Sequence, residues 1–181
     1  QEMSRGLGDV YKRQVYDPDP GSYIEFDGHD ITNEPPHKIG ALGLSRTFQL
    51  LRLYQDMSVI NNVMSGYHTR VKYKFFDAVI GRKKIWDQEK EIKDEMMELL
   101  SFVGLADYAE LNASELSGGQ RRLLVLARAI AMKPKLLMLD EPAAGLSPVN
   151  VDNLMKIIMQ LKDKYGLTLI IIEHILKVVM D

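Results

Sequence analysis

The sequence predicts an α/β fold with a parallel sheet, and the order of elements in its last third carries this prediction. The four apolar residues Leu136–Leu139 form the kind of run that is typical of a strand buried on both faces of a parallel sheet. A helix is expected from Pro148 to about Tyr165, and a second apolar strand from Leu167 to Ile172. Strand, helix and strand in this order form a βαβ unit, whose two strands run in parallel.

A second helix is predicted to begin at Ser117, and the residues of its first turn suit an anion. Ser117 is expected to cap the helix, and Gln120 stands at the reciprocal position of a capping box. Gly118 and Gly119 leave the first turn without side-chain bulk. A phosphate can therefore approach the free backbone N–H groups and the positive end of the helix dipole.

Two acids follow the strand Leu136–Leu139 directly. Asp140 and Glu141 are expected at the carboxyl edge of the sheet, where open α/β sheets bind their ligands. Asp140 offers a hard oxygen ligand for Mg²⁺, and Glu141 is the candidate general base for an attacking water. The alternative is an ordinary amphipathic helix followed by a buried strand and a solvated acidic turn. That alternative explains neither the paired glycines nor the adjacent acids.

Composition excludes several classes of protein. The chain of 181 residues is 46% hydrophobic and 27% charged, which is ordinary for a globular protein. The net charge of −2 argues against a nucleic-acid partner, because no basic excess is present to displace counterions. No run of about 18 apolar residues and no signal-peptide pattern are present. The absence of cysteine excludes disulfides and thiolate metal sites and fits a reducing cytosol.

The stretch from Leu116 to Pro148 resembles the ATP-binding-cassette (ABC) family. LSGGQ, a helix, four apolar residues and Asp-Glu-Pro correspond to the signature motif, the Walker B strand and the D-loop. The resemblance implies an α/β fold of the P-loop NTPase (RecA-like) type, in which a parallel-sheet core carries an ABC-type α-helical subdomain. It implies that residues 15–49 and 134–181 form part of the core and that residues 50–133 form the helical subdomain.

The same resemblance assigns roles to two further residues. Gln49 stands where the family has the Q-loop glutamine, whose amide carbonyl is a ligand of Mg²⁺ or its water, so Gln49 and Asp140 are the expected metal ligands. His174 stands at the family's H-loop and is expected to act in catalysis with Glu141. ATP and Mg²⁺ are the implied substrate and cofactor. A lone glutamine or histidine at such a position is more often structural, so both roles depend on the motifs around them.

The signature turn is expected to serve a second subunit. In the family, two ATPase subunits pack head to tail, and the serine and glycines of one signature motif complete the phosphate site of the other. The resemblance therefore implies that nucleotide is bound by Ser117, Gly118, Gly119 and Gln120 together with Asp140 and Gln49 of the partner. The expected assembly is a homo- or heterodimer with nucleotide in its interface.

Residues 1–14 do not fit this pattern. Arg5 and Gly6 stand where the family has the Lys-Thr pair of the Walker A loop, and no GxxxxGK[ST] motif is present. We expect residues 1–14 to be non-native sequence and the chain to be a fragment that lacks Walker A and the C-terminal end. The alternative is a genuine, degenerate Walker A. A Walker A loop with its lysine would supply about four charge-assisted hydrogen bonds to the phosphates, each worth roughly 1.5–3 kcal/mol. Without them, the chain as printed is predicted neither to bind ATP well nor to hydrolyse it.

Three segments resemble the ATPases of branched-chain amino-acid (leucine/isoleucine/valine) importers. They are SRTFQLLRLYQDMSVINNV, DEPAAGLSP and IIIEH, although Ile175 and Ser147 depart from the usual residues of that subfamily. The resemblance implies a peripheral subunit at the cytoplasmic face of the bacterial plasma (inner) membrane. Its implied partners are membrane permease subunits and, indirectly, a periplasmic binding protein.

Other functions remain open at this stage. A related lipopolysaccharide-export ATPase and a catalytically dead ABC interaction subunit are the main alternatives. A chromosome-organising ATPase would need a long coiled coil between Gln49 and Leu116, and the insert there is too short. A translation-associated ABC protein would carry a second cassette. The sequence does not identify the transported substrate, because the ATPase subunit does not contact it.

Overall fold

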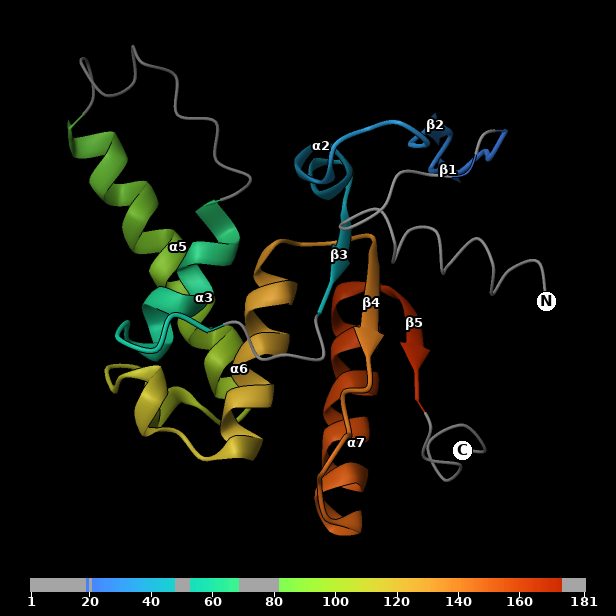
Figure 1. The fold of residues 1–181 in the computed structure, drawn as a ribbon. Helices are drawn as coiled ribbons and strands as arrows, with labels where there is room; N and C mark the ends of the chain where they lie inside the picture. Colours follow the sequence, from blue (N-terminus) through green and yellow to red (C-terminus); the bar gives the residue numbers. More distant parts are fainter. Residues whose placement is uncertain (1–18, 20, 48–52, 69–81, 174–181) are drawn as a thin grey trace. The chain divides into compact units, whose positions relative to one another are not determined.

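The computed structural model describes residues 19, 21–47, 53–68 and 82–173. The chain divides into two compact units, Gln1–Leu44 and Ser45–Asp181. Each unit is described below by itself. The described elements, labelled in Figure 1, are β1 (Glu25–Phe26), β2 (His29–Asp30), α2 (Pro36–Ala41), β3 (Leu44–Arg46), α3 (Val59–His68), α5 (Arg82–Phe102), α6 (Gly118–Ala131), β4 (Leu136–Asp140), α7 (Pro148–Tyr165) and β5 (Thr168–Ile172), with short 3₁₀ turns at Ala106–Tyr108 and Ala113–Glu115.

The first unit is built on a tight hairpin. Strands β1 and β2 pair antiparallel across an Asp-Gly turn, in which Asp27 has a φ of 51° and Gly28 a φ of 76°. Positive φ at both central residues is the geometry that favours Asp-Gly in hairpins. Thr32, which is buried, accepts a 2.8 Å hydrogen bond from the amide of Ile24 and fixes the chain after the hairpin.

The second unit contains the predicted parallel sheet, with the strand order β3-β4-β5. Strands β4 and β5 run in parallel, with a register from Leu136 opposite Thr168 to Asp140 opposite Ile172. On the other side of β4, the amide of Thr47 donates to the carbonyl of Met138 at 2.9 Å. Strand β4 is almost wholly buried, as its sequence predicts, whereas β5 is only partly buried along its length.

The helices and β4 of the second unit share a continuous apolar core. Helix α6 packs against α3 and α5. Residues of α6, β4 and α7 line one pocket, so α6 and α7 both lie close to the strand. Gly66 of α3 allows a close crossing, because a Cβ there would lie 2.3 Å from the carbonyl oxygen of Arg128 in α6. Met96 of α5 is buried in this core.

Left-handed glycines follow two of the helices, and the end of α7 at Tyr165 confirms the predicted one. Gly104 follows α5 with a φ of 74°, and Gly166 follows α7 with a φ of 62°. Glycine is favoured at this position because it lacks the Cβ that makes the left-handed conformation costly. None of the helices in the described ranges combines the length and the apolar character that crossing a bilayer requires.

Candidate nucleotide site

The acidic end of β4 lies beside strand β3. Asp140 ends β4, and its carboxylate oxygen Oδ2 accepts a 3.0 Å hydrogen bond from a guanidinium nitrogen of Arg46. The two side chains are only 9% and 10% exposed, so the pair is a buried salt bridge. A buried carboxylate needs a partner because burial removes its hydration. Arg46 therefore holds Asp140 at the edge of the sheet.

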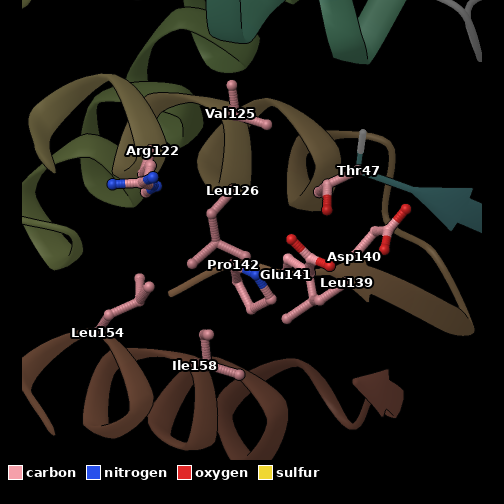
Figure 2. Close-up of a pocket in the computed structure, with 10 residues that line it drawn as sticks. All are labelled: Thr47, Arg122, Val125, Leu126, Leu139, Asp140, Glu141, Pro142, Leu154 and Ile158. Atoms are coloured by element: carbon pink, nitrogen blue, oxygen red, sulfur yellow. The ribbon is translucent and has the colours of Figure 1, made fainter. Parts of the chain in front are cut away.

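Glu141 begins the turn that follows β4. Its backbone has a φ of 46°, and its amide donates to the carbonyl of Ile172 at the end of β5 at 2.8 Å. Figure 2 shows Asp140 and Glu141 together at the end of the strand, near Thr47, with Arg122 of α6 on the other side of the same pocket. Apolar side chains form the rest of the pocket wall, namely Val125, Leu126, Leu139, Pro142, Leu154 and Ile158.

The predicted capping box at the start of α6 is confirmed. The Oγ of Ser117 accepts from the amide of Gln120 at 3.3 Å, and the Oε1 of Gln120 accepts from the amide of Ser117 at 2.8 Å. A Cβ placed on Gly118 or Gly119 would meet no atom within 4 Å. The first turn is therefore open to an approaching group, as the phosphate-binding interpretation requires.

The signature turn and the acids lie at different concavities of the second unit. Ser117 and Gly119 line a groove with Leu123 of α6 and with residues of α7, whereas Asp140 and Glu141 line the pocket at the end of β4. Arg122 borders both. This arrangement agrees with the expectation that the signature turn serves the phosphate site of another subunit. That expectation stays a prediction.

Two predicted site residues cannot be placed. Gln49 and His174 lie outside the described residues, as do residues 1–14, so their predicted roles stay predictions. The residue before His174 is described. Glu173 accepts a 2.7 Å hydrogen bond from the amide of Ala143, which connects the end of β5 to the turn after β4.

Sequence reasoning did not assign roles to three charged residues at the site: Arg46, Arg122 and Glu173. Each contacts a residue that is distant in sequence or lies on another element. Arg46 pairs with Asp140, and the guanidinium of Arg122 donates to the carbonyl of Ala144. One signal was available, since Arg46 and Glu173 stand at strand ends and Arg122 lies two residues after the LSGGQ motif. No local periodicity identifies their partners.

The acids at the end of β4 fit a magnesium ion that is shared with phosphates. The described residues contain no group of three or more His, Cys, Asp or Glu side chains arranged to hold a metal by themselves. Mg²⁺ in nucleotide sites takes only one or two carboxylates and completes its shell with water and substrate phosphates. Asp140 with Glu141 beside it matches this donor set, and such a site needs no all-protein cage.

Comparison with known proteins gives a consistent result. The family model described as ABC transporter matches residues 13–144. The chain is 36% identical over 161 residues to the high-affinity branched-chain amino acid transport ATP-binding protein BraF of Pseudomonas aeruginosa, covering 89% of this chain and 63% of BraF. It is 34% identical over 165 residues to LivG of Escherichia coli K12, covering 91% of this chain and 64% of LivG. It thus spans less than two thirds of either relative.

Solved structures agree with the sequence comparisons. The ATP-binding cassette MJ1267 in its ADP conformation superposes with a TM-score of 0.69 at 32% identity, covering 87% of this chain and 61% of MJ1267. A nucleotide-free ATP-binding cassette gives a TM-score of 0.73 at 30% identity, covering 96% of this chain and 68% of that chain. The predicted P-loop NTPase fold with an ABC-type helical part is confirmed. With LSGGQ, the strand ending in Asp-Glu and these matches taken together, the chain belongs to the ABC transporter family.

Proposed function

We propose that the protein carrying this chain is the ATP-binding and ATP-hydrolysing subunit of an ABC importer, and that its cargo is branched-chain amino acids. The placement of Glu141 beside Asp140, at the carboxyl end of a buried parallel strand, carries the hydrolytic part of this proposal. The importer and its cargo are proposed from the similarity to BraF and LivG, whose names state branched-chain amino acid transport.

The proposed role of each residue follows from the chemistry of its side chain. Asp140 and Gln49 would hold Mg²⁺, which when bound neutralises part of the phosphate charge. Glu141 orients or deprotonates the attacking water. His174, which directly follows Glu173 beyond β5, holds that water in register with Glu141. The buried salt bridge with Arg46 keeps the carboxylate of Asp140 from turning away from the edge of the sheet.

The signature turn supports a head-to-tail dimer. The first turn of α6 is capped, exposed and without bulk at Gly118 and Gly119, so it is a preformed anion site. It does not line the pocket that contains Asp140 and Glu141. We therefore propose that Ser117 and these glycines contact nucleotide held by a second ATPase subunit. Because nucleotide would lie in the interface, its binding and subunit association would be thermodynamically linked.

An exposed apolar surface of the helical part is the proposed permease contact. Tyr54, Met57, Tyr108 and Leu111 are large side chains that remain exposed. The two segments that carry them are joined by backbone hydrogen bonds, including one from the amide of Val59 to the carbonyl of Leu111 at 2.9 Å. We propose that a cytoplasmic helix of a membrane permease docks here, which would hold the subunit at the cytoplasmic face of the membrane. A periplasmic binding protein would act on it only through the permease.

Substitution of the general base tests the hydrolytic function. In the complete gene product, Glu141→Gln is expected to lower kcat for magnesium-dependent ATP hydrolysis at least about 100-fold, because the amide cannot accept the proton. Nucleotide affinity should stay within about threefold, since binding does not need this proton transfer. Glu91→Gln, on the exposed face of α5, is the matched control. Undiminished turnover in Glu141→Gln would contradict the proposal.

The chain as printed is proposed to be inactive. It carries no GxxxxGK[ST] motif, and the backbone amides and lysine of that loop supply much of the phosphate binding in P-loop proteins. Isothermal titration of the 181-residue chain with Mg-ATP should show no binding in the micromolar range. Measurable magnesium-dependent hydrolysis by this chain would be the contrary result.

Uptake of labelled leucine by vesicles that contain the complete transporter tests the cargo.

A further inference from the structure

The turn after β4 has a backbone conformation that needs external support. Glu141 has a φ of 46°, which lies in the left-handed region that residues with a Cβ rarely adopt. Such a residue keeps this conformation only where its surroundings determine it. Because φ sets the direction of the side chain, the supports of this turn also set where the Glu141 carboxylate lies.

Three contacts from other elements hold the turn. The amide of Glu141 donates to the carbonyl of Ile172 at 2.8 Å, and the amide of Ala143 donates to Oε1 of Glu173 at 2.7 Å. On the α6 side, Arg122 donates to the carbonyl of Ala144. Two of the three contacts therefore come from the end of β5.

The two contacts at the end of β5 differ in kind. The hydrogen bond from the Glu141 amide to the Ile172 carbonyl uses backbone only, so it continues the β4–β5 ladder, in which Asp140 pairs with Ile172. The partly buried side chain of Glu173 instead accepts, through its carboxylate, a hydrogen bond from the amide of Ala143, two residues beyond Glu141. Charge-assisted hydrogen bonds of this kind are short and directional. No sheet pairing requires a glutamate there.

We propose that Glu173 is a positioning residue for Glu141. Its carboxylate fixes the amide of Ala143 and so holds the turn in the conformation that aims the general base. The consequence for hydrolysis rests on the function proposed above, whereas the consequence for the turn does not. Glu173 also directly precedes His174 in the chain. Its hydrogen bond therefore links the turn that carries Glu141 to the segment that carries His174.

Amide hydrogen exchange on the 181-residue chain tests the structural half. Glu173→Met keeps a similar length but removes the acceptor, and the Ala143 amide should then exchange at least about tenfold faster, because its protection depends on this bond. Glu173→Gln keeps an acceptor oxygen and should stay within about threefold. The amide of Leu139, inside β4, should not change in either variant. Equal protection of Ala143 in all three proteins would overturn the proposal.

Steady-state kinetics on the complete gene product test the catalytic half. Glu173→Met should lower kcat about tenfold to 100-fold while KM for ATP changes less than about twofold, since misplacing a catalytic group affects the chemical step. Glu173→Gln should recover most of kcat. An unchanged kcat in Glu173→Met, or a Glu173→Gln variant as slow as it, would overturn the proposal.

A second variant covers the case in which Glu173→Met does not fold. Glu173→Asp keeps the charge but withdraws the carboxylate by one methylene, and it should also release Ala143 and lower kcat. Full activity in Glu173→Asp would count against positioning by this bond. If the unsubstituted complete protein hydrolyses no ATP, the proposed function fails, and the exchange of Ala143 still decides whether Glu173 holds the turn.

Discussion

Helices α6 and α7 flank strand β4 in the chain, and they end alike but begin differently. Lys133, just after α6, pairs with Glu95 at 2.7 Å, and Lys164, in the last turn of α7, pairs with Glu98 at 2.8 Å. Both glutamates belong to α5. A cation near a helix C-terminus also complements the helix dipole. The two C-terminal ends are therefore fixed by the same kind of contact.

The two N-termini have nearly the same backbone but different side-chain chemistry. Ser117 and Ser147 are both N-caps in an extended conformation, but only Ser117 makes the side-chain hydrogen bond to the first turn. Helix α7 begins instead with Pro148, which has no N–H to satisfy. The capping hydrogen bond is therefore one difference between the two helix starts. Helix α6 adds two glycines with open space around them, and α7 does not.

The largest expected effect comes from blocking the start of α6. Ser117→Arg in the complete gene product should lower ATP turnover at least about 100-fold, because a bulky side chain would occupy the place of a preorganised donor to the phosphate. Met159→Arg, at an exposed position on α7, should stay within about twofold. ATPase assays on both purified variants make the comparison. Full turnover in Ser117→Arg would remove the functional difference between the two helix starts.

Removing the caps one at a time sharpens the structural difference. Ser117→Ala should lower the free energy of unfolding by roughly 0.5–2 kcal/mol, because the amide of Gln120 loses its acceptor. Ser147→Ala should cost less than about 0.5 kcal/mol, since its side chain caps no N–H in the structure. Urea denaturation of the 181-residue chain measures both. Equal losses would mean that Ser147 caps α7 in solution.

A third substitution separates stability from binding at the same turn. Gly119→Ala should raise the free energy of unfolding by up to about 1 kcal/mol, because alanine loses less backbone entropy and no atom obstructs its Cβ. The same change should weaken turnover by the complete protein, since the methyl group would lie where a phosphate approaches. A loss of stability in Gly119→Ala would show that the turn is more crowded than the structure indicates.

The smallest expected effect concerns the ion pairs near the C-terminal ends of α6 and α7. The hydrogen bond and charge of Lys164 lower the pKa of Glu98. A lowered carboxyl pKa adds stability above the pKa of the unfolded chain, and this contribution is lost as pH falls through the folded value. The difference in Tm between the unsubstituted chain and Glu98→Gln should therefore be small at pH 7, begin to shrink near the ordinary pKa of 4.5 and vanish only below the lowered pKa of folded Glu98. It should also shrink in 1 M salt, where the screening length is about 3 Å. A difference that persists in acid would contradict this account.

Local patterns predicted the elements around the site well. The capping box of α6, the strand β4 that ends in Asp140 and the glycine after α7 each depend on residues within a few positions of one another. Such features follow from side-chain chemistry along the chain. Ser147 likewise takes the N-cap position of α7, directly before Pro148, although its side chain makes no capping hydrogen bond.

Long-range contacts could not be predicted in the same way. Arg46 and Asp140 are 94 positions apart, and Ala143 and Glu173 are 30 positions apart. Only the order of strands β3, β4 and β5 brings these pairs together. An apolar run like that of β5 is typical of a buried strand, but burial depends on what covers the strand. In the described part of the chain, β5 pairs with β4 and is only partly buried.

At Glu141, the proposed general base, the left-handed backbone favours other residues than the glutamate that the proposed hydrolysis needs. Glycine adopts a φ of 46° without the strain that a Cβ brings, and asparagine tolerates it better than glutamate does. A laboratory selection for heat resistance alone would therefore enrich Glu141→Gly or Glu141→Asn and discard the carboxylate. Engineers who seek a more robust form of this cassette should keep position 141 fixed and look for stabilising changes elsewhere.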